Sequence, residues 1–170
     1  MAEYSIGFAE KLIEAAQSIT LGCEQSIDAG RTVLYLSLLS SEISLKALLE
    51  HAGKPIPDII RCQHRLADLL KETDKCFVHT VIVAGGTQRR WIPATSIRAL
   101  TFEDRGAKST VGAFLNSENR GASKYPNEVR YGDRLMHFPP TAALSAATLI
   151  VDWARRHWEH FRLAPLMESP

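Results

Sequence analysis

The stretch from Arg31 to His51 constrains the fold more than any other part of this sequence, because it runs for 21 residues without proline or glycine. That length corresponds to about six turns of α-helix. Its apolar residues recur at steps of three and four and are too many for one narrow face: Val33, Leu34, Leu36, Leu38, Leu39, Ile43, Leu45, Leu48 and Leu49. The pattern predicts a helix through the core, with Asp28 as its N-cap and Gly53 as its stop.

The same stretch also carries polar residues. A line of small ones would let a neighbouring backbone come close: Ser37, Ser40, Ser41 and Ser44. Glu42 and Lys46, four residues apart, lie on one face of a helix and are spaced for an ion pair. The simplest interpretation is a half-exposed helix with an ordinary ion pair, which contributes little to stability when it is solvated.

The composition is that of an ordinary globular protein, with 45% hydrophobic and 23% charged residues among 170. A chain of this length can bury a core without disulfides or a structural metal, so we expect one domain over residues 1–163. The formal net charge of +1 argues against a protein that coats nucleic acid with its whole surface. Positive charge is nevertheless concentrated between residues 85 and 137, where nine basic residues accompany five acidic ones.

The cysteine usage and the hydropathy favour a cytoplasmic protein that has no membrane partner. The three scattered cysteines, Cys23, Cys62 and Cys76, do not resemble the framework of a disulfide-rich secreted domain. No apolar run appears long enough to be read as a membrane span, and acidic residues interrupt the N-terminal segment where a signal peptide would be apolar.

Three further segments have helical periodicity. We predict a first amphipathic helix from Tyr4 to about Thr20, a short one from His64 to Glu72, and a long one from Pro139 to about Phe161. Residues 53–58 should form a turn or an extended loop, since each of the two prolines in this segment disfavours a helical conformation in the residue before it.

Between about residues 78 and 128 the pattern changes. Phe77–Val83 and Arg89–Pro93 are rich in β-branched or aromatic residues and flank a glycine turn, which is typical of a β-hairpin, although residues 81–84 could instead end a helix. Residues 109–117 are a candidate short helix and residues 119–127 a candidate loop. We expect residues 164–170 to be a flexible tail. The segment from about Gly85 to Phe138 is long for a connection within a compact domain, and such a connection usually serves a function or a partner.

Arg130 and His137, with six residues between them, are the first candidates for chemistry. An arginine holds a phosphate with a fork of charged donors, and a histidine that titrates near neutrality moves protons. Together they could cleave RNA without a metal ion, with His137 activating the ribose 2′-hydroxyl and Arg130 stabilising the pentacoordinate phosphorus. Pairs at this spacing also occur by chance, so the alternative is a solvated arginine and a loop histidine.

Other combinations carry weaker signals. Four residues are of the zinc-ligand type, but their separations are irregular and we expect no metal: Cys62, His64, Cys76 and His79. The Gly85-Gly86 pair lacks the further glycine and the lysine of a phosphate-binding loop and is more simply a turn. Basic and aromatic residues in the positive segment are candidates for contact with nucleic acid or another ligand: Arg89, Arg90, Trp91, Lys124 and Arg134.

Three parts of the chain, taken together, point to a known family. They are Glu42-x-x-x-Lys46 in the central helix with Gly53-Lys54-Pro55 after it, His64-x-Leu66-x-x-Leu69-Leu70, and Val129-Arg130-Tyr131 shortly before the last helix. In these segments the chain resembles the HEPN family of small helical-bundle domains, which occur in prokaryotic toxin–antitoxin, abortive-infection and nucleotidyltransferase-associated systems.

The resemblance implies a mainly α fold, an antiparallel bundle of four or five helices, here with a partly irregular insertion at about residues 78–128 that can hold a β-hairpin. Members of the family are often dimeric, so a homodimer is expected. The other partners that the resemblance implies are RNA or a nucleotide, and an antitoxin or nucleotidyltransferase protein. No cofactor is implied.

The resemblance also implies a function. Many members are metal-independent ribonucleases with an Arg-x4–6-His motif, which Arg130 and His137 fit, and the supporting residues here would be Glu42, Lys46, His64 and Tyr131. The expected function is engagement of RNA or phosphate ligands, with ribonuclease activity in a defence or stress system. Other members have lost the motif, and the alternative is a dimeric binding or scaffold module without catalysis.

Overall fold

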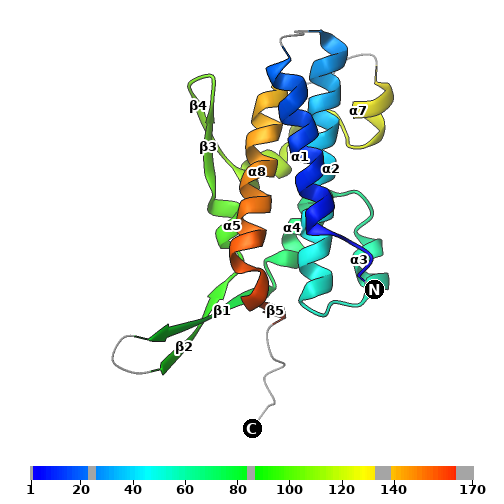
Figure 1. Ribbon diagram of the computed structural model, residues 1–170. Coiled ribbons are helices and arrows are strands. Elements are labelled where there is room, and N and C mark those ends of the chain that lie inside the picture. The colour runs from blue at the N-terminus through cyan, green and yellow to red at the C-terminus, as the bar shows by residue number, and fades with distance from the viewer. Residues whose placement is uncertain (1, 23–25, 84–86, 133–138, 164–170) are drawn as a thin grey trace.

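The computed structural model describes residues 2–22, 26–83, 87–132 and 139–163, and within this set it describes residues 79–83 and 87–92 by their backbone alone. In the described part of the chain, most of the core lies between three long helices that stand side by side (Figure 1): α1 (Ile6–Leu21), α2 (Ile27–His51) and α8 (Pro140–His157). The prediction of a mainly α protein is confirmed. The expected tail, residues 164–170, lies outside the described residues.

The central helix α2 begins earlier than predicted. Its N-cap is Ser26, whose Oγ accepts a hydrogen bond from the N–H of Ala29 at 3.0 Å, so the prediction of Asp28 as the N-cap is wrong. Asp28 lies in the first turn, where its negative charge interacts favourably with the helix dipole. Gly53 has a φ of +92°, a backbone conformation that favours glycine, and ends the helix as predicted.

By length and composition α2 could also cross a membrane. In this structure 72% of its most apolar window is buried against the rest of the protein, as in the core helix of a soluble protein. The length and composition of α2 are therefore only weak evidence for a membrane span, because the core helices of soluble proteins share them.

Small residues allow the long helices to approach closely. The hydroxyl of Ser40 donates a hydrogen bond across to the carbonyl of Ala9 on α1, at 2.8 Å. The other three serines of the line are buried too, and each donates to a carbonyl one turn back in α2: Ser37, Ser41 and Ser44. On α8, the buried surface is built largely from alanines. The serine hydroxyls are therefore satisfied without separating the helices.

The segment after α2 is helical where we predicted a turn or an extended loop. The helix α3 (Ile56–Arg61) starts directly after Pro55, and Pro57 lies in its first turn. Proline is tolerated there because the N–H groups of a first turn have no partner within the helix. A turn follows, and α4 (Leu66–Thr73) begins two residues later than predicted, which leaves His64 outside the helix.

A three-stranded sheet closes one end of the protein. β1 (Cys76–Val83) and β2 (Thr87–Pro93) form the predicted antiparallel hairpin, so the alternative of a helix end from residue 81 is wrong. The short strand β5 (Phe161–Leu163) pairs with the other edge of β1 and places Phe161 opposite Val78. Both side chains are buried and anchor the sheet in the core, although we predicted a helix as far as Phe161.

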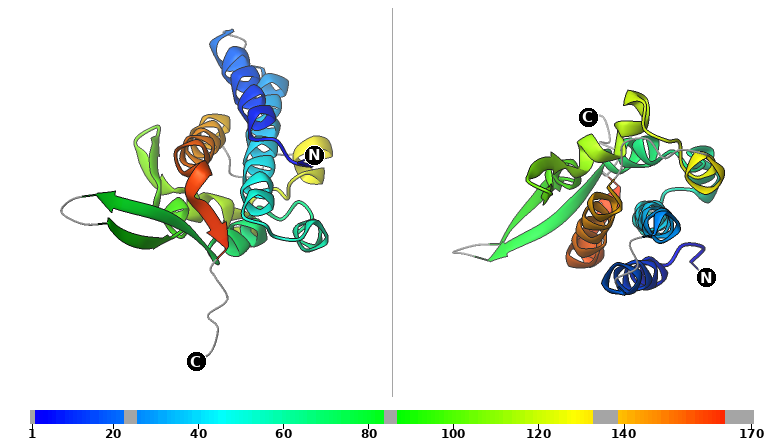
Figure 2. Two further views of the ribbon diagram at one scale, coloured as in Figure 1. Left: turned by 60° about the horizontal axis from the view of Figure 1, so that its bottom comes forward. Right: turned by 90° about the horizontal axis from the view of Figure 1, so that it is seen from above.

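The elements between β2 and α8 are short: α5 (Ser96–Ala99), β3 (Thr101–Asp104), β4 (Ala107–Thr110), α6 (Val111–Leu115), the 3-10 helix η1 (Ser117–Arg120) and α7 (Asn127–Tyr131). A further 3-10 helix, η2 (Trp158–His160), follows α8. β3 and β4 form a second hairpin. The predicted helix at residues 109–117 is present as the shorter α6, and part of the predicted loop is η1. The β1–β2 hairpin extends away from the helices on the side opposite to α3 and α7 (Figure 2).

Candidate functional site

The carboxylate of Glu42 lies at the centre of a buried polar cluster. Glu42 and Lys46 are 4% and 7% exposed, so they form the predicted ion pair, at 2.7 Å, but not on a half-exposed surface. His64 places its Nδ1 atom 3.0 and 3.1 Å from the two carboxylate oxygens, and the hydroxyl of Tyr125 donates to Oε2 at 2.8 Å. We call these four residues the Glu42 cluster. A buried carboxylate is tolerable when it is paired and hydrogen-bonded in this way.

His64 reaches the cluster from the turn between α3 and α4. The N–H of Gln63 donates to Ile60 at 2.8 Å and the N–H of Arg65 donates to Cys62 at 3.1 Å, which closes the turn tightly. Gln63 has a φ of +51°. The side chain of His64 is 56% exposed although its Nδ1 atom meets a buried carboxylate. One edge of the imidazole ring is therefore fixed by the protein while much of the ring faces solvent.

Tyr125 reaches the cluster from the loop between η1 and α7. Its backbone N–H donates to the carboxylate of Glu118 at 2.8 Å, which ties the loop to η1. Burial raises the pKa of the Tyr125 hydroxyl, and the negative charge of Glu42 raises it further. The hydroxyl therefore stays protonated and acts as a donor. Burial also raises the pKa of Glu118.

The N-terminal residues cover Lys46 from the other side. The N–H groups of Glu3 and Tyr4 donate to the carboxylate of Glu50 at 2.8 and 2.9 Å. They hold the ring of Tyr4 5.3 Å from the ammonium nitrogen of Lys46, which is a cation–π distance. Lys46 thus lies between a carboxylate and an aromatic ring.

A row of rings leads from His64 to Arg130. The centroid of the Tyr125 ring lies 6.2 Å from that of His64 and 5.8 Å from that of Tyr35 on α2. The guanidinium of Arg130 lies over the Tyr35 ring, 4.6 Å from its centroid, and donates to the Tyr35 hydroxyl. Arg31 donates to the carbonyls of Arg130 and Gly132 and so holds the end of α7 against α2.

The structure brings four of the predicted site residues into this region: Glu42, Lys46, His64 and Arg130. Tyr131 follows on α7 and is 77% exposed. Lys124 is exposed, and its backbone N–H donates to the carboxylate of Glu128. His137 and Arg134 lie outside the described residues.

The predicted binding residues Arg89, Arg90 and Trp91 belong to β2, and their side chains are not described. Their backbone lies on the hairpin, which points away from α7 (Figure 2). The structure therefore does not bring this strand together with Arg130.

Sequence reasoning missed Tyr35 and Tyr125. Tyr35 precedes Glu42 by seven residues, which is two helical turns, and this spacing could have placed the two on one face of the helix. Tyr125 is 83 residues away from Glu42 and had no comparable local signal.

The contacts with Glu42 fix the orientation of the His64 ring. Glu42 is ion-paired with Lys46 and is therefore an ionised carboxylate, which can only accept hydrogen bonds. The Nδ1 atom of His64 must then carry a proton and donate it in the hydrogen bond to the carboxylate. A carboxylate that fixes the tautomer and orientation of a histidine is a common arrangement in enzymes.

The residues of zinc-ligand type do not form a metal centre in the part of the chain that is described, where no group of three or more candidate ligands comes together. Cys62 and Cys76 are buried free thiols. Burial raises the pKa of both, to about 11 for Cys76, and a protonated thiol is a poor metal ligand. The side chain of His79 is not described.

A groove of about 360 Å³ lies between α3 and α4, next to the turn that holds His64. Three of its cations are paired with acidic neighbours: Arg61 with Asp58, Arg65 with Asp68, and Lys54 with Glu72. The groove is therefore nearly balanced in charge and is a weak candidate for binding an anion.

No family model matches this chain, and no curated protein or solved structure matches it.

Proposed function

We propose that this chain is a HEPN-like protein that engages RNA through its phosphates and cleaves it without a metal ion. The observation that carries the proposal is the position of His64, whose Nδ1 is bound by the buried carboxylate of Glu42 while the side chain is 56% exposed. This is what a histidine needs if it is to exchange protons with a bound substrate.

In the proposed reaction His64 is the general base. Its Nε2 atom takes the proton of a ribose 2′-hydroxyl, and the 2′-oxygen then forms a bond to the neighbouring phosphorus. The bond from phosphorus to the 5′-oxygen breaks, and this oxygen leaves with a proton from water. The products are a 2′,3′-cyclic phosphate and a 5′-hydroxyl. Glu42 stabilises the imidazolium that forms on His64, and Lys46 and Tyr125 hold the carboxylate in place.

Arg130 is the proposed phosphate-binding residue. It lies at the other end of the row of rings and is exposed. One of the five N–H donors of its guanidinium bonds to Tyr35, which leaves up to four for a ligand. A guanidinium holds two phosphate oxygens at once, so Arg130 would anchor a phosphate of the RNA backbone away from the one that is cleaved beside His64. The exposed ring of Tyr131 would stack on a neighbouring base.

The test is cleavage of a mixed-sequence RNA by the purified protein in EDTA. We expect cleavage by the wild type, a roughly 10²- to 10⁴-fold loss in His64→Ala, and a clear loss in Arg130→Ala. His160→Ala and Arg156→Ala are matched controls, because both residues are exposed and neither belongs to the Glu42 cluster: Arg156 lies in the last turn of α8 and His160 in η2. Circular dichroism shows whether each variant keeps its fold.

The same experiment separates His64 from the histidine of the sequence motif. His137→Ala is tested beside His64→Ala. If only the His137 variant is inactive, His137 is the base and the role of His64 is structural. If both are inactive, the two histidines share the proton transfers. A folded wild type that does not cleave RNA would refute the nuclease.

A second candidate is a dimeric binding module without catalysis. The β1–β2 hairpin favours this candidate. The hairpin extends from the helices on the side opposite to α7, so it offers a contact surface separate from Arg130 (Figure 2). Its partner would be an antitoxin or nucleotidyltransferase protein in the same cytoplasm. In this case His64→Ala and Arg130→Ala would not alter the binding of the partner, and light scattering would still give twice the mass of one chain.

A further inference from the structure

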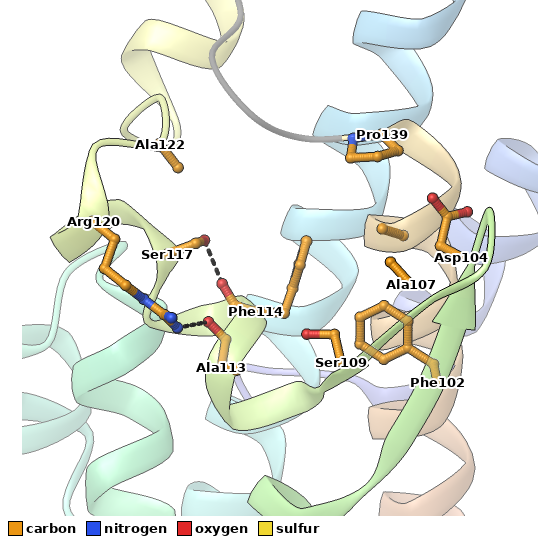
Figure 3. Close-up of a pocket in the computed structure, with 11 residues that line it drawn as sticks. Phe102, Asp104, Ala107, Ser109, Ala113, Phe114, Ser117, Arg120, Ala122 and Pro139 are labelled. Carbon is orange, nitrogen blue, oxygen red and sulfur yellow. Dashed lines mark hydrogen bonds between the residues drawn. The ribbon is translucent and has the colours of Figure 1, made fainter.

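A cavity of about 350 Å³ lies between the β3–β4 hairpin, α6 and the start of α8 (Figure 3). Its size falls in the range of small-molecule sites, which begins at about 300 Å³. None of the residues that line it belongs to the Glu42 cluster. The cavity is therefore a separate feature of the molecule, and the proposed ribonuclease activity gives it no role.

Most of the cavity wall is apolar. Phe102 on β3 and Phe114 on α6 meet edge to face, with ring centroids 6.0 Å apart at 82°. Alanines and a proline form much of the rest: Ala107, Ala113, Ala122, Pro139 and Ala142. Such a surface gains free energy by covering an apolar body and offers little to a bare phosphate or a metal ion.

The two ends of the cavity carry opposite charges. Arg120 and Asp104 stand on opposite sides of the apolar wall (Figure 3). Arg120 uses its Nη2 to donate to the carbonyl of Ala113 at 2.6 Å, which holds the guanidinium at the rim and leaves its other donors for a ligand. Asp104 is half-buried and forms no ion pair with any residue that the structure describes.

We propose that this cavity binds a small amphipathic molecule with charges at both ends. Its apolar body, a ring or a short branched chain, would cover Phe102 and Phe114. An anionic group would lie against Arg120 and a cationic amine against Asp104. Charge complementarity selects this class of ligand over a neutral apolar molecule, which would leave the Asp104 carboxylate half-buried without a partner.

The test uses 4-(aminomethyl)benzoate as the probe, because it carries an amine and a carboxylate at opposite ends of one ring. Titration followed by calorimetry should show saturable binding with a dissociation constant on the order of 1 mM, as expected for a molecule of this size. Two analogues, 4-methylbenzoate and benzylamine, each lack one charge. Each should bind several-fold more weakly than the probe.

Variants locate the site. Arg120→Gln should reduce the affinity for the probe to that for benzylamine, and Asp104→Asn should reduce it to that for 4-methylbenzoate. Ala107→Trp places a large side chain in the cavity from an exposed position on β4 and should abolish binding. Ala99→Trp, at an exposed position on α5 outside the cavity, is the matched control and should bind as the wild type does.

The proposal is overturned if the folded wild type shows no saturable binding, or if Ala107→Trp binds the probe as well as Ala99→Trp does. It is also overturned if the two analogues bind as tightly as the probe, since the charged ends would then contribute nothing. Thermal unfolding of every variant shows that a loss of binding is not a loss of the fold.

Discussion

At the scale of single residues, Lys46 should be far more important for stability than an exposed lysine. Lys46→Met keeps most of the side-chain volume but leaves the buried Glu42 carboxylate without its cation. Removing one partner of a buried pair typically costs 3–5 kcal/mol, so we expect a loss of about that size in the free energy of unfolding. Urea unfolding followed by circular dichroism measures it.

The matched control is Lys11→Met, which breaks an ion pair of the same length, 2.7 Å to Glu14, between side chains that are 71% and 58% exposed. This change should cost less than about 1 kcal/mol. The double variant Glu42→Gln/Lys46→Met removes both charges and should be more stable than Lys46→Met alone. Equal costs at the two lysines would contradict the burial of the Glu42 cluster.

The sequence predicted the pairing of Glu42 with Lys46 because a spacing of four places both on one helical face. It could not predict the burial, since the residues that cover the pair come from other parts of the chain. Tyr4 precedes α2, and His64 and Tyr125 follow it in two different loops. Local spacing carries no information about such contacts.

At the scale of elements, two histidines pack on tryptophans where the C-terminal ends of α2 and α8 meet: His51 ends α2 and His157 ends α8. The ring of His51 stacks on Trp158 at 4.2 Å, and the ring of His157 lies 4.6 Å from Trp153. Burial lowers the pKa of both histidines. The positive charge of Arg162 lowers the pKa of His51 further, and Arg156 and His160 do the same for His157.

Stability should therefore fall as the pH falls below about 6.5, the ordinary pKa of histidine. The unfolded chain takes up protons at that pH, whereas these two histidines bind protons in the folded state only at lower pH. The double variant His51→Phe/His157→Phe keeps two rings and removes both titrations. Its melting temperature should decline less than that of the wild type between pH 7.5 and 5.5.

At pH 8 these histidines are neutral in both states, so a difference between the two proteins there measures packing alone. Glu118, whose pKa is raised, acts in the opposite direction but is present in both proteins and cancels from the comparison. Parallel decreases in melting temperature would show that the two histidines do not cause the pH dependence.

The elements that the sequence predicted poorly are the short ones. The rule that proline disfavours a helix in the preceding residue led to a loop at residues 53–58, but Pro57 occupies the first turn of α3, where the missing N–H costs nothing. β5 has three residues and exists because β1 offers it an edge. The long helices and the β1–β2 hairpin were predictable because their patterns extend over many residues.

At the scale of the whole molecule, protection from hydrogen exchange should be centred on α2. This helix packs between α1 and α8, and its residues from Ser37 to Leu49 are nearly all buried. The β3–β4 hairpin has strands of four residues and is largely exposed. We expect the amides of α2 to exchange on the order of 10³-fold more slowly than those of the hairpin.

Exchange followed by mass spectrometry of peptides measures this ratio directly. Peptides from α1 and α8 are internal controls and should resemble α2, because all three helices share one core. Equal protection of α2 and the β3–β4 hairpin would show that the molecule opens as one unit under the conditions of the experiment.

The order of the elements along the chain also affects how the protein folds as it is made. α1 and α2 are neighbours in sequence and can pair as soon as both exist, but α8 begins 88 residues after Ala52 closes α2. At about 5–20 residues per second, synthesis of that segment takes roughly 4 to 18 s. For that time the face of α2 that later meets α8 has no α8 to cover it, and an apolar surface exposed in this way is prone to aggregation.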